Sequence, residues 1–457
     1  MWSTPVTRLG AYDRAMAAEL TGETTELLQA MIRNGCVNDG TPDSGDERRN
    51  ADLLQTYLEG AGLDVERFTS RADRTSIVAR IEGSDPEAPT LCLMGHTDVV
   101  PVSPEGWSRD PFDGDLVDGE VWGRGAIDML NLTSSMAVAF RTLAQAGWKP
   151  RGTLIYFGVA DEEAGGVWGA KWMADHHWDA IASDYVLTEM GGWPHGGGRK
   201  VGICVGEKGI AWRRLTVKGT PGHGSMPYGA DNAVIKASEV VRRLSEYNPG
   251  AHLDEMWAAR VGASNLADDL KSGLLDPARL ADTLAGLPQG QSKLFHACTH
   301  TTISPNMMHG GVKTNVIPDS VQIDVDIRTL PGVTAEDVNR YVREALGDLA
   351  EHVEVESIFD DEATASSTRN SLFETLTRAT RTVYPEADLL PELIVGATDA
   401  RFFRQKGAVA YGTGLYAPDV TFEQFASRFH GHDERIDVRS LGLCTDYWLD
   451  ICREFLG

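Results

Sequence analysis

The sequence predicts an α/β fold interrupted by a second, smaller domain. Strands of continuous apolar residues alternate with helices over 1–208, which is typical of a parallel sheet covered on both faces. Strands of period-2 polarity replace them over 209–358, and the apolar pattern returns afterwards. The chain of 457 residues also exceeds the usual size of one domain. We therefore expect an outer domain formed by 1–208 and 359–457, with an inserted domain at 209–358.

The outer domain is expected to contain a helix in DSGDERRNADLLQTYLEGAG. Ser44 and Glu47 have the spacing of a capping box, and glycines at 60 and 62 end the pattern. The following strands are expected at about 64–68, 75–82, 90–95, 153–160 and 184–188, with helices near 133–146 and 167–175. Beyond 360, LIVGATDA and AVAYGTG indicate the return of the outer domain.

The inserted domain has a different pattern. IAWRRLTVKG, VQIDVDIR and HVEVESIF alternate between apolar and polar residues, as half-buried strands do. Helices are expected near 231–246 and 334–350, so the order is βαββαβ and the domain is a small ferredoxin-like α+β unit. Residues 250–300 are expected to form a mostly helical insertion within it.

Composition excludes several classes of partner. The formal net charge of -25 argues against nucleic acid or an anionic membrane as a partner, because both attract basic surfaces. The six cysteines include no CxxC pair, which favours reduced thiols over a disulfide framework. The charged segment 1–23 has no apolar core of a leader, and no stretch approaches the roughly 18 apolar residues of a membrane span. We expect a soluble cytoplasmic protein.

Side chains able to bind a metal follow three of the apolar strands. The carboxyl ends of parallel strands meet at one edge of a sheet, where clustered carboxylates repel one another unless a cation lies among them. Imidazole mixed with carboxylates favours zinc, with manganese or cobalt as alternatives, over magnesium or calcium. The residues concerned are His96, Asp98, Asp161, Glu162, Glu163 and Glu189, with Asp128 after a glycine-rich turn and His430 and His432 before the last helix.

Rival catalytic motifs are absent or broken. GRGAID has Asp128 where a dinucleotide-binding fingerprint needs its third glycine. The sequence contains no phosphate-binding GxxxxGK[ST], no HExxH and no GxSxG nucleophile elbow. GHGS at 222–225 is weak support for a serine hydrolase without that elbow.

Taken together, the motifs resemble those of the M20 family of metallopeptidases and deacylases. They occur in family order from about 40 to 440, so the resemblance covers most of the chain. It implies a zinc-peptidase-like catalytic domain and an inserted lid and dimerisation domain. The matching stretches are GHTDVVPV, GWSRDPFDGDLVDGEVWGRGAIDM, DEEAGG, TEMGG, GTPGHGSMP, KTNVIPDSVQIDVDIRTLPG, GATDARF and FHGHDER.

The resemblance implies two divalent metal ions, zinc first, with cobalt or manganese as alternatives. His96, Asp128 and Glu189 would hold one ion. Asp128, Glu163 and His430 would hold the other, so that Asp128 bridges the pair.

Other site residues follow from the same resemblance. Glu162 is expected to act as the general base, and Asp98 to orient the metal-binding ring of the preceding histidine. His223 resembles the histidine that reaches across a dimer and stabilises the tetrahedral oxyanion. Asn315 and Arg328 match residues that contact substrate, and Arg328 suits a substrate carboxylate. Further support of the site is expected from Thr398, Asp399 and Arg401.

Two departures from the family pattern stand out. The residues at 129–131 are Met-Leu-Asn, where Met-Lys-Gly is usual, so a lysine near the bridging carboxylate is lost. His432 occupies a position where an apolar residue is commoner. The spacing to Glu434 favours His430 as the ligand, with His432 as the alternative.

The resemblance implies an amidohydrolase that uses a metal-activated water on N-acyl amino acids, dipeptides or short peptides. The substrate is expected to carry a free carboxylate, and the chain to form a homodimer through the lid domain. One alternative is a deacylase of the succinyl-diaminopimelate desuccinylase type. Another is a homologue that binds peptides or dimerises without turnover.

Overall fold

The computed structural model describes residues 11–457, with the side chains of 11–14 and 422–423 outside the description. The first ten residues of the segment predicted to carry no leader therefore lie outside the described residues. The chain divides into two compact units. Unit 1 takes in the described residues up to Val205 together with Ser366–Glu392 and Thr398–Gly457, and unit 2 consists of Gly206–Ala365 and Leu393–Ala397.

Unit 1 is built on a mixed sheet whose central strands run parallel. The strand order is β1-β2-β6-β3-β7-β18-β9, with parallel pairing between β6, β3, β7 and β18 and antiparallel pairing towards both edges. β3 and β6 are buried along their whole length, which explains why both have continuous apolar sequences. The bounds are β1 Val65–Arg71, β2 Arg74–Ile81, β3 Leu91–His96, β6 Leu154–Val159, β7 Tyr185–Thr188, β9 Lys200–Glu207 and β18 Val409–Gly412; β8 Gly191–His195 and β17 Asp388–Ile394 also pair with β9.

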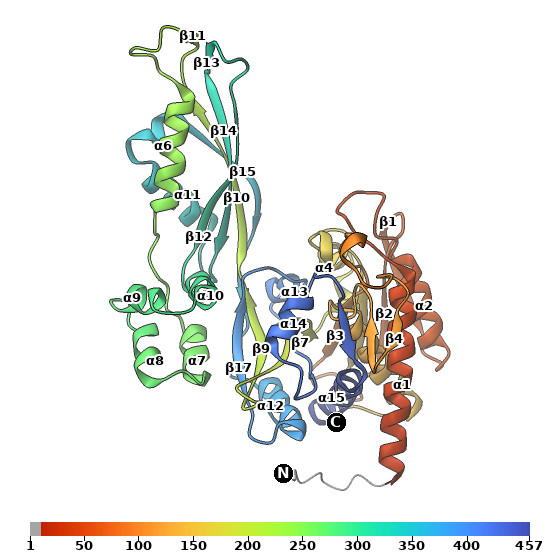
Figure 1. Ribbon diagram of the computed structural model, residues 1–457. Helices are drawn as coiled ribbons and strands as arrows, with labels where there is room; N and C mark the ends of the chain where they lie inside the picture. The colour runs from red at the N-terminus through yellow and green to blue at the C-terminus, as the bar shows by residue number, and fades with distance from the viewer. Residues whose placement is uncertain (1–10) are drawn as a thin grey trace. The chain divides into compact units, whose positions relative to one another are not determined.

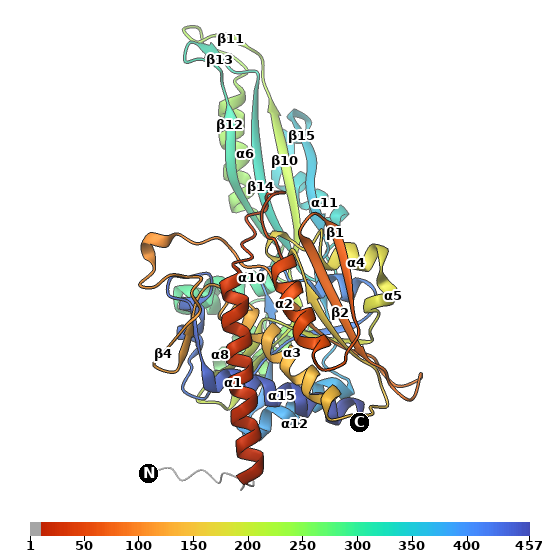
Figure 2. The ribbon, with the colours of Figure 1, turned by 90° about the vertical axis from the view of Figure 1, so that its right-hand side faces the viewer.

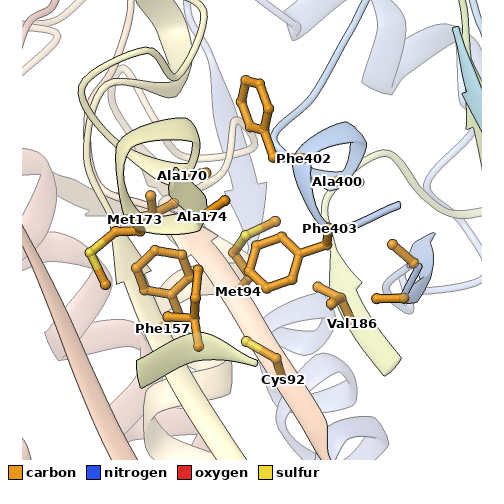
Figure 3. Close-up of a cluster of buried hydrophobic side chains, with 14 of the residues drawn as sticks. Cys92, Met94, Phe157, Ala170, Met173, Ala174, Val186, Ala400, Phe402 and Phe403 are labelled. Carbon is orange, nitrogen blue, oxygen red and sulfur yellow. The ribbon is translucent and has the colours of Figure 1, made fainter. Parts of the chain in front are cut away.

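Helices cover both faces of this sheet. Adjacent residues of a strand point to opposite faces, and Tyr156 packs on Phe140 of α3 while Phe157 packs on Phe403 of α13. Figure 3 shows the second face, where Met94 and Phe157 of the sheet meet side chains of α4 and α13. On the first face α1, α3 and α15 lie against one another (Figure 2). The bounds are α1 Ala11–Asn34, α3 Leu130–Gln145, α4 Ala170–His176, α5 Trp178–Ile181, α12 Ser371–Val383, α13 Ala400–Gln405, α14 Phe422–Arg428 and α15 Val438–Leu456.

Helix α2, Arg48–Glu59, does not have the predicted capping box. Glu47 is its N-cap residue, but no side chain caps the helix, and the Ser44 hydroxyl donates to the Thr41 carbonyl at 3.0 Å. The Glu47 carboxylate is instead fully buried and paired with the Arg74 guanidinium. The prediction is wrong because a tertiary ion pair takes the carboxylate that local spacing assigned to the helix end.

Unit 2 has the predicted βαββαβ order. Its four strands pair antiparallel in the order β12-β14-β10-β15, and α6 and α11 pack on the same face of the sheet (Figure 1). The predicted helical insertion forms a separate apolar cluster. The bounds are β10 Gly209–Lys218, α6 Ala233–Glu246, α7 Glu255–Ala263, α8 Asp268–Leu274, α9 Leu280–Ala285, α10 Gln289–Thr299, β12 Thr302–Gly310, β14 Ser320–Thr329, α11 Ala335–Leu346 and β15 Val353–Asp361.

Small elements complete both units. A three-stranded sheet joins β4 Asp115–Val117, β5 Glu120–Trp122 and β19 Arg435–Asp437, while β11 Gly222–His223 pairs with β13 Val316–Ile317 and β16 Thr364–Ala365 pairs with β9. The predicted α/β fold with an inserted α+β domain is confirmed. Within the described part of the chain, no helix combines the length and apolarity needed to cross a membrane.

Candidate metal centre

His96 is the last residue of β3, and its buried ring is oriented by the chain just beyond the strand. The ring Nδ1 lies 3.0 Å from the Asp98 backbone carbonyl, so Nδ1–H donates to that oxygen. This tautomer leaves the lone pair on Nε2. Nε2 lies 3.3 Å from Asp128 Oδ1 and 3.8 Å from Glu189 Oε2. The strand therefore delivers a nitrogen suited to metal binding among carboxylates.

Asp128 stands between two histidines. Its Oδ1 faces His96, and its Oδ2 lies 2.7 Å from Nε2 of His430. The same His430 nitrogen is 3.6 Å from Glu163 Oε2. A carboxylate with one oxygen toward each histidine has the geometry of a bridging ligand.

The donor set fits divalent ions. Ligand atoms of His96, Asp128 and Glu163 lie within 4.8 Å of one another, as do those of His96, Glu162 and Glu189. Burial first, and then repulsion from neighbouring carboxylates, raises the pKa of Glu162, Glu163 and Glu189. Glu163 Oε1 is also buried without a hydrogen-bond partner within the described residues. A bound cation would reduce the repulsion among these crowded carboxylates and give the unpaired oxygen a partner.

Asp98 contacts both the His96 ring and the turn that follows β6. Its carboxylate is 3.6 Å from His96 Nδ1, and the backbone carbonyl makes the closer contact with the ring. The carboxylate instead accepts the backbone N–H groups of Glu162 at 3.3 Å and Glu163 at 3.1 Å, and the Asn38 side-chain amide at 2.8 Å. Those donors draw the carboxylate toward the turn that carries the predicted base, so Asp98 orients that turn.

The turn at 161–166 is held from its other side by the segment after β17. Asp161, Gly165 and Gly166 all have positive φ, and the Arg401 guanidinium donates to the Gly165 carbonyl at 2.7 Å. The Asp399 carboxylate is buried against Gly166, and neither of its oxygens has a hydrogen-bond partner in the described chain. A Cβ at position 166 would lie 2.1 Å from Asp399 Oδ1, so this approach requires glycine.

Two buried arginines support the site, and sequence reasoning missed both. The Arg74 guanidinium pairs with Glu47 and donates to Asn38 Oδ1 at 3.0 Å, and Asn38 in turn donates to Asp98. This network reaches the turn of Glu162 and Glu163 from behind. A charge buried by tertiary contacts has no local sequence signal.

The second arginine supports the bridging carboxylate. Arg124 donates to Glu434 at 2.6 Å and to the His430 carbonyl at 3.3 Å. Glu434 accepts the backbone N–H of Ile127 at 2.8 Å and that of Asp128 at 3.3 Å. The pair thus ties the chain at 128 to the chain at 430. Its only sequence signal was the short spacing from His430 to Glu434.

The two departures from the expected pattern occupy different surroundings. His430 faces the cluster, whereas the His432 ring packs against Gly106, so His430 is the histidine brought to Asp128. Asn131 is buried at 1% exposure, and neither amide atom finds a hydrogen-bond partner in the described residues. Leu130 packs its side chain against Gly125.

The predicted lid residues lie in unit 2, at two ends of its sheet. His223 is exposed on β11; the Ser225 backbone N–H donates to its Nδ1 at 3.2 Å, which leaves the ring proton on Nε2. The Asn315 carbonyl accepts the Gly224 N–H at 2.8 Å, so Asn315 lies beside the two-stranded ribbon of β11 and β13 that carries His223. Arg328 pairs with residue 210 of β10, whereas residue 218 of β10 adjoins the ribbon end. The stretch 210–218 spans about 27 Å at about 3.4 Å per residue.

A comparison with known families shows to which family this chain belongs. The model of Peptidase family M20/M25/M40 matches residues 92–454. The chain belongs to this family. The resemblance proposed from the motifs is confirmed, and the M20 chain is a metallohydrolase.

Individual relatives and solved M20 structures agree. N-fatty-acyl-amino acid synthase/hydrolase PM20D1 of Xenopus tropicalis is 25% identical over 452 residues, covering 94% of this chain and 86% of the relative. Succinyl-diaminopimelate desuccinylase of Parvibaculum lavamentivorans is 28% identical over 431 residues, covering 91% of this chain and 92% of the relative. The metallo-carboxypeptidase Sso-CP2 of Sulfolobus solfataricus has the same fold, with a TM-score of 0.69 at 17% identity over 95% of this chain and 99% of that chain.

A further solved structure concerns the metals. A dinuclear metal binding peptidase of the M20 family from Bacillus subtilis superposes with a TM-score of 0.61 at 14% identity, over 97% of this chain and 99% of that chain. At this identity the likeness shows the fold. The geometry around Asp128 is this chain's own support for a two-ion site.

Proposed function

We propose that this chain hydrolyses the amide bond of small substrates that carry a free carboxylate, N-acyl amino acids first and dipeptides or short peptides second. The observation that carries the proposal is Asp128 between His96 and His430, with the Glu162 carboxylate 4.0 Å from His96 Nε2. The relatives named for N-acyl amino acid and succinyl amide substrates support the substrate class.

Two divalent ions, zinc first by ligand type, would be held by the proposed ligands. These are His96, Asp128 and Glu189 for one ion and Asp128, Glu163 and His430 for the other. When bound, such ions polarise a carbonyl and lower the pKa of water.

Glu162 takes the proton of the attacking water and returns it to the leaving nitrogen. Its side chain is 12% exposed, and its backbone N–H is held by Asp98, so the carboxylate stays near the cluster while its neighbour Glu163 serves as a ligand. His223, with its proton on Nε2, can donate to the oxyanion that forms on the substrate carbonyl. Arg328 and Asn315 bind the substrate.

A homodimer completes this proposal. His223 and Asn315 lie at one end of the unit 2 sheet and Arg328 at the other, about 27 Å away by strand length. One copy cannot bring both ends to one small substrate. We therefore propose that His223 and Asn315 contribute to the site of a second copy. Sedimentation tests whether the chain forms a dimer. Mixing His223→Ala subunits with Glu162→Gln subunits tests whether one copy serves the site of the other.

A hydrolysis screen tests the activity. Release of amino acid from N-acetyl and N-succinyl amino acids and from dipeptides is measured with added zinc, manganese or cobalt, with Glu162→Gln as the inactive control. Exclusive turnover of N-succinyl substrates would favour the desuccinylase alternative. No turnover with any metal would overturn the proposal in favour of a homologue that only binds.

A further inference from the structure

The open face of the unit 2 sheet, opposite α6 and α11, is polar over most of its length. Two of its basic side chains are paired across strands: Arg214 donates from Nε and Nη2 to Asp324 at 2.7 Å each, and Lys218 pairs with Glu354. Such cross-strand pairs stabilise a face of the sheet that is exposed to solvent, so these residues need no further explanation.

One end of the same face is different. The Trp212 and Phe359 rings face each other across β10 and β15 with centroids 5.8 Å apart. They are 40% and 38% exposed, which leaves a large aromatic surface open to solvent. Ile210 continues this patch along β10 and pairs with Arg328 of β14.

Asp326 links the aromatic pair to Arg328. The same oxygen, Asp326 Oδ1, accepts Trp212 Nε1–H at 2.9 Å and Arg328 Nε–H at 2.9 Å. One carboxylate thereby orients both the indole and the guanidinium. Neither terminal nitrogen of Arg328 donates to any residue that the structure describes. An arginine held at Nε with its terminal pair open has the geometry for bidentate binding of a carboxylate.

We propose that Trp212 and Phe359 form an apolar subsite beside Arg328, which selects substrates whose carboxylate-bearing residue has a large apolar or aromatic side chain. The inference rests on the proposed amide hydrolysis. In an N-acyl amino acid the carboxylate and the side chain share one carbon, so a group beside the carboxylate site contacts that side chain. Glycine or aspartate at this position gains no contact with the rings.

The test compares N-acetyl-phenylalanine with N-acetyl-glycine as substrates for the full-length, metal-loaded protein. Trp212→Thr and Phe359→Thr are each expected to lower kcat/KM for N-acetyl-phenylalanine about tenfold, mainly through KM, with N-acetyl-glycine within about twofold. Trp212→Phe keeps an aromatic ring and is expected to retain most of the selectivity. Val355→Thr is the matched control. Val355 is an exposed residue of β15, the strand of Phe359, and it pairs with Leu215, which faces the helices.

The outcomes separate the subsite from the hydrolysis. An equal fall on both substrates, or no fall on either, overturns the subsite and leaves the rings as a stabilising cross-strand pair. Calorimetric binding of N-acetyl-phenylalanine that depends on Trp212, without hydrolysis by the wild type, supports the subsite and overturns the proposed function. Thermal unfolding of each variant shows whether a loss comes from folding.

Discussion

The Asp98 carboxylate lies 3.1 Å from the backbone nitrogen of Glu163 and accepts its N–H bond. The carbonyl of the same residue holds the His96 ring at 3.0 Å. One residue thus couples two elements of the candidate site, a strand end and a turn.

Replacing Glu162 with Gln is expected to lower kcat by about 10³-fold, because the amide cannot take the proton of the attacking water. Metal content, measured by elemental analysis, is expected to stay at the wild-type level. Glu66→Gln, at an exposed position of β1, serves as the control. Full activity of the Glu162 variant would remove it as the base.

Replacing Asp98 with Asn is expected to lower kcat about 10–100-fold with a smaller change in KM. The amide has one acceptor oxygen, so it cannot satisfy the two backbone donors and Asn38 together. Steady-state kinetics with saturating metal measure this change. If the variant loses metal but regains full kcat when metal is added in excess, the role of Asp98 is limited to orienting the His96 ring.

The Arg74 ion pair is expected to matter more for stability than any exposed pair. Arg74→Met leaves Glu47 buried without its partner and should lower the free energy of unfolding by about 3–5 kcal/mol. Arg48→Met removes an exposed pair with Asp73, which solvent and salt screen, and should cost far less. Urea unfolding of both variants measures the difference. Equal costs would contradict a buried support network.

The ionisation of His430 links metal binding to pH. In the metal-free chain, the hydrogen bond to Asp128 and the nearby Glu163 carboxylate raise its pKa to about 10. A raised histidine pKa stabilises the fold fully below the unfolded value near 6.5, and this contribution is lost as pH rises towards 10. Binding an ion must displace the proton, so metal affinity is expected to rise between pH 6.5 and 9 with proton release. Calorimetry in buffers of different ionisation enthalpy measures it, and His430→Asn should reduce the slope.

Substitutions at two adjacent glycines can distinguish the effect of backbone strain from the effect of packing against Asp399. Gly165 and Gly166 have φ of +93° and +68°, but only at 166 would a Cβ meet Asp399, at 2.1 Å. Gly165→Ala should cost about 1–2 kcal/mol of stability with little change in kcat. Gly166→Ala should cost about 2–4 kcal/mol and lower kcat as well, since the turn bearing Glu162 must shift. Identical effects of the two variants would show that Asp399 does not position the turn.

The chemistry of the site could be predicted from sequence because strand ends are local features. The buried run of β3 ends in His96, and polar residues follow β6 and β7 in the same way. Parallel strands bring such ends to one edge whatever the details of packing. The βαββαβ pattern of unit 2 is equally local, since its period-2 polarity reflects one covered face.

Supporting contacts could not be predicted, because they join residues far apart in the chain. Glu47 has the spacing of a capping box, yet burial beside Arg74 decides its partner. Asp98 has the spacing to orient a histidine, yet the backbone donors of the turn after β6 attract its carboxylate.

The sequence by itself therefore determined the family, the order of the elements and the residue types that gather at the candidate metal centre. Only the tertiary structure decided which oxygen of Asp98 faces His96 and which histidine of FHGHDER reaches Asp128. It also decided that Trp212 and Arg328 share Asp326. The spacing of a motif reflects how the chain runs within one helix, strand or turn. Hydrogen-bond partners that lie on different elements are selected by burial and by competition among donors, and both arise only when the chain is packed.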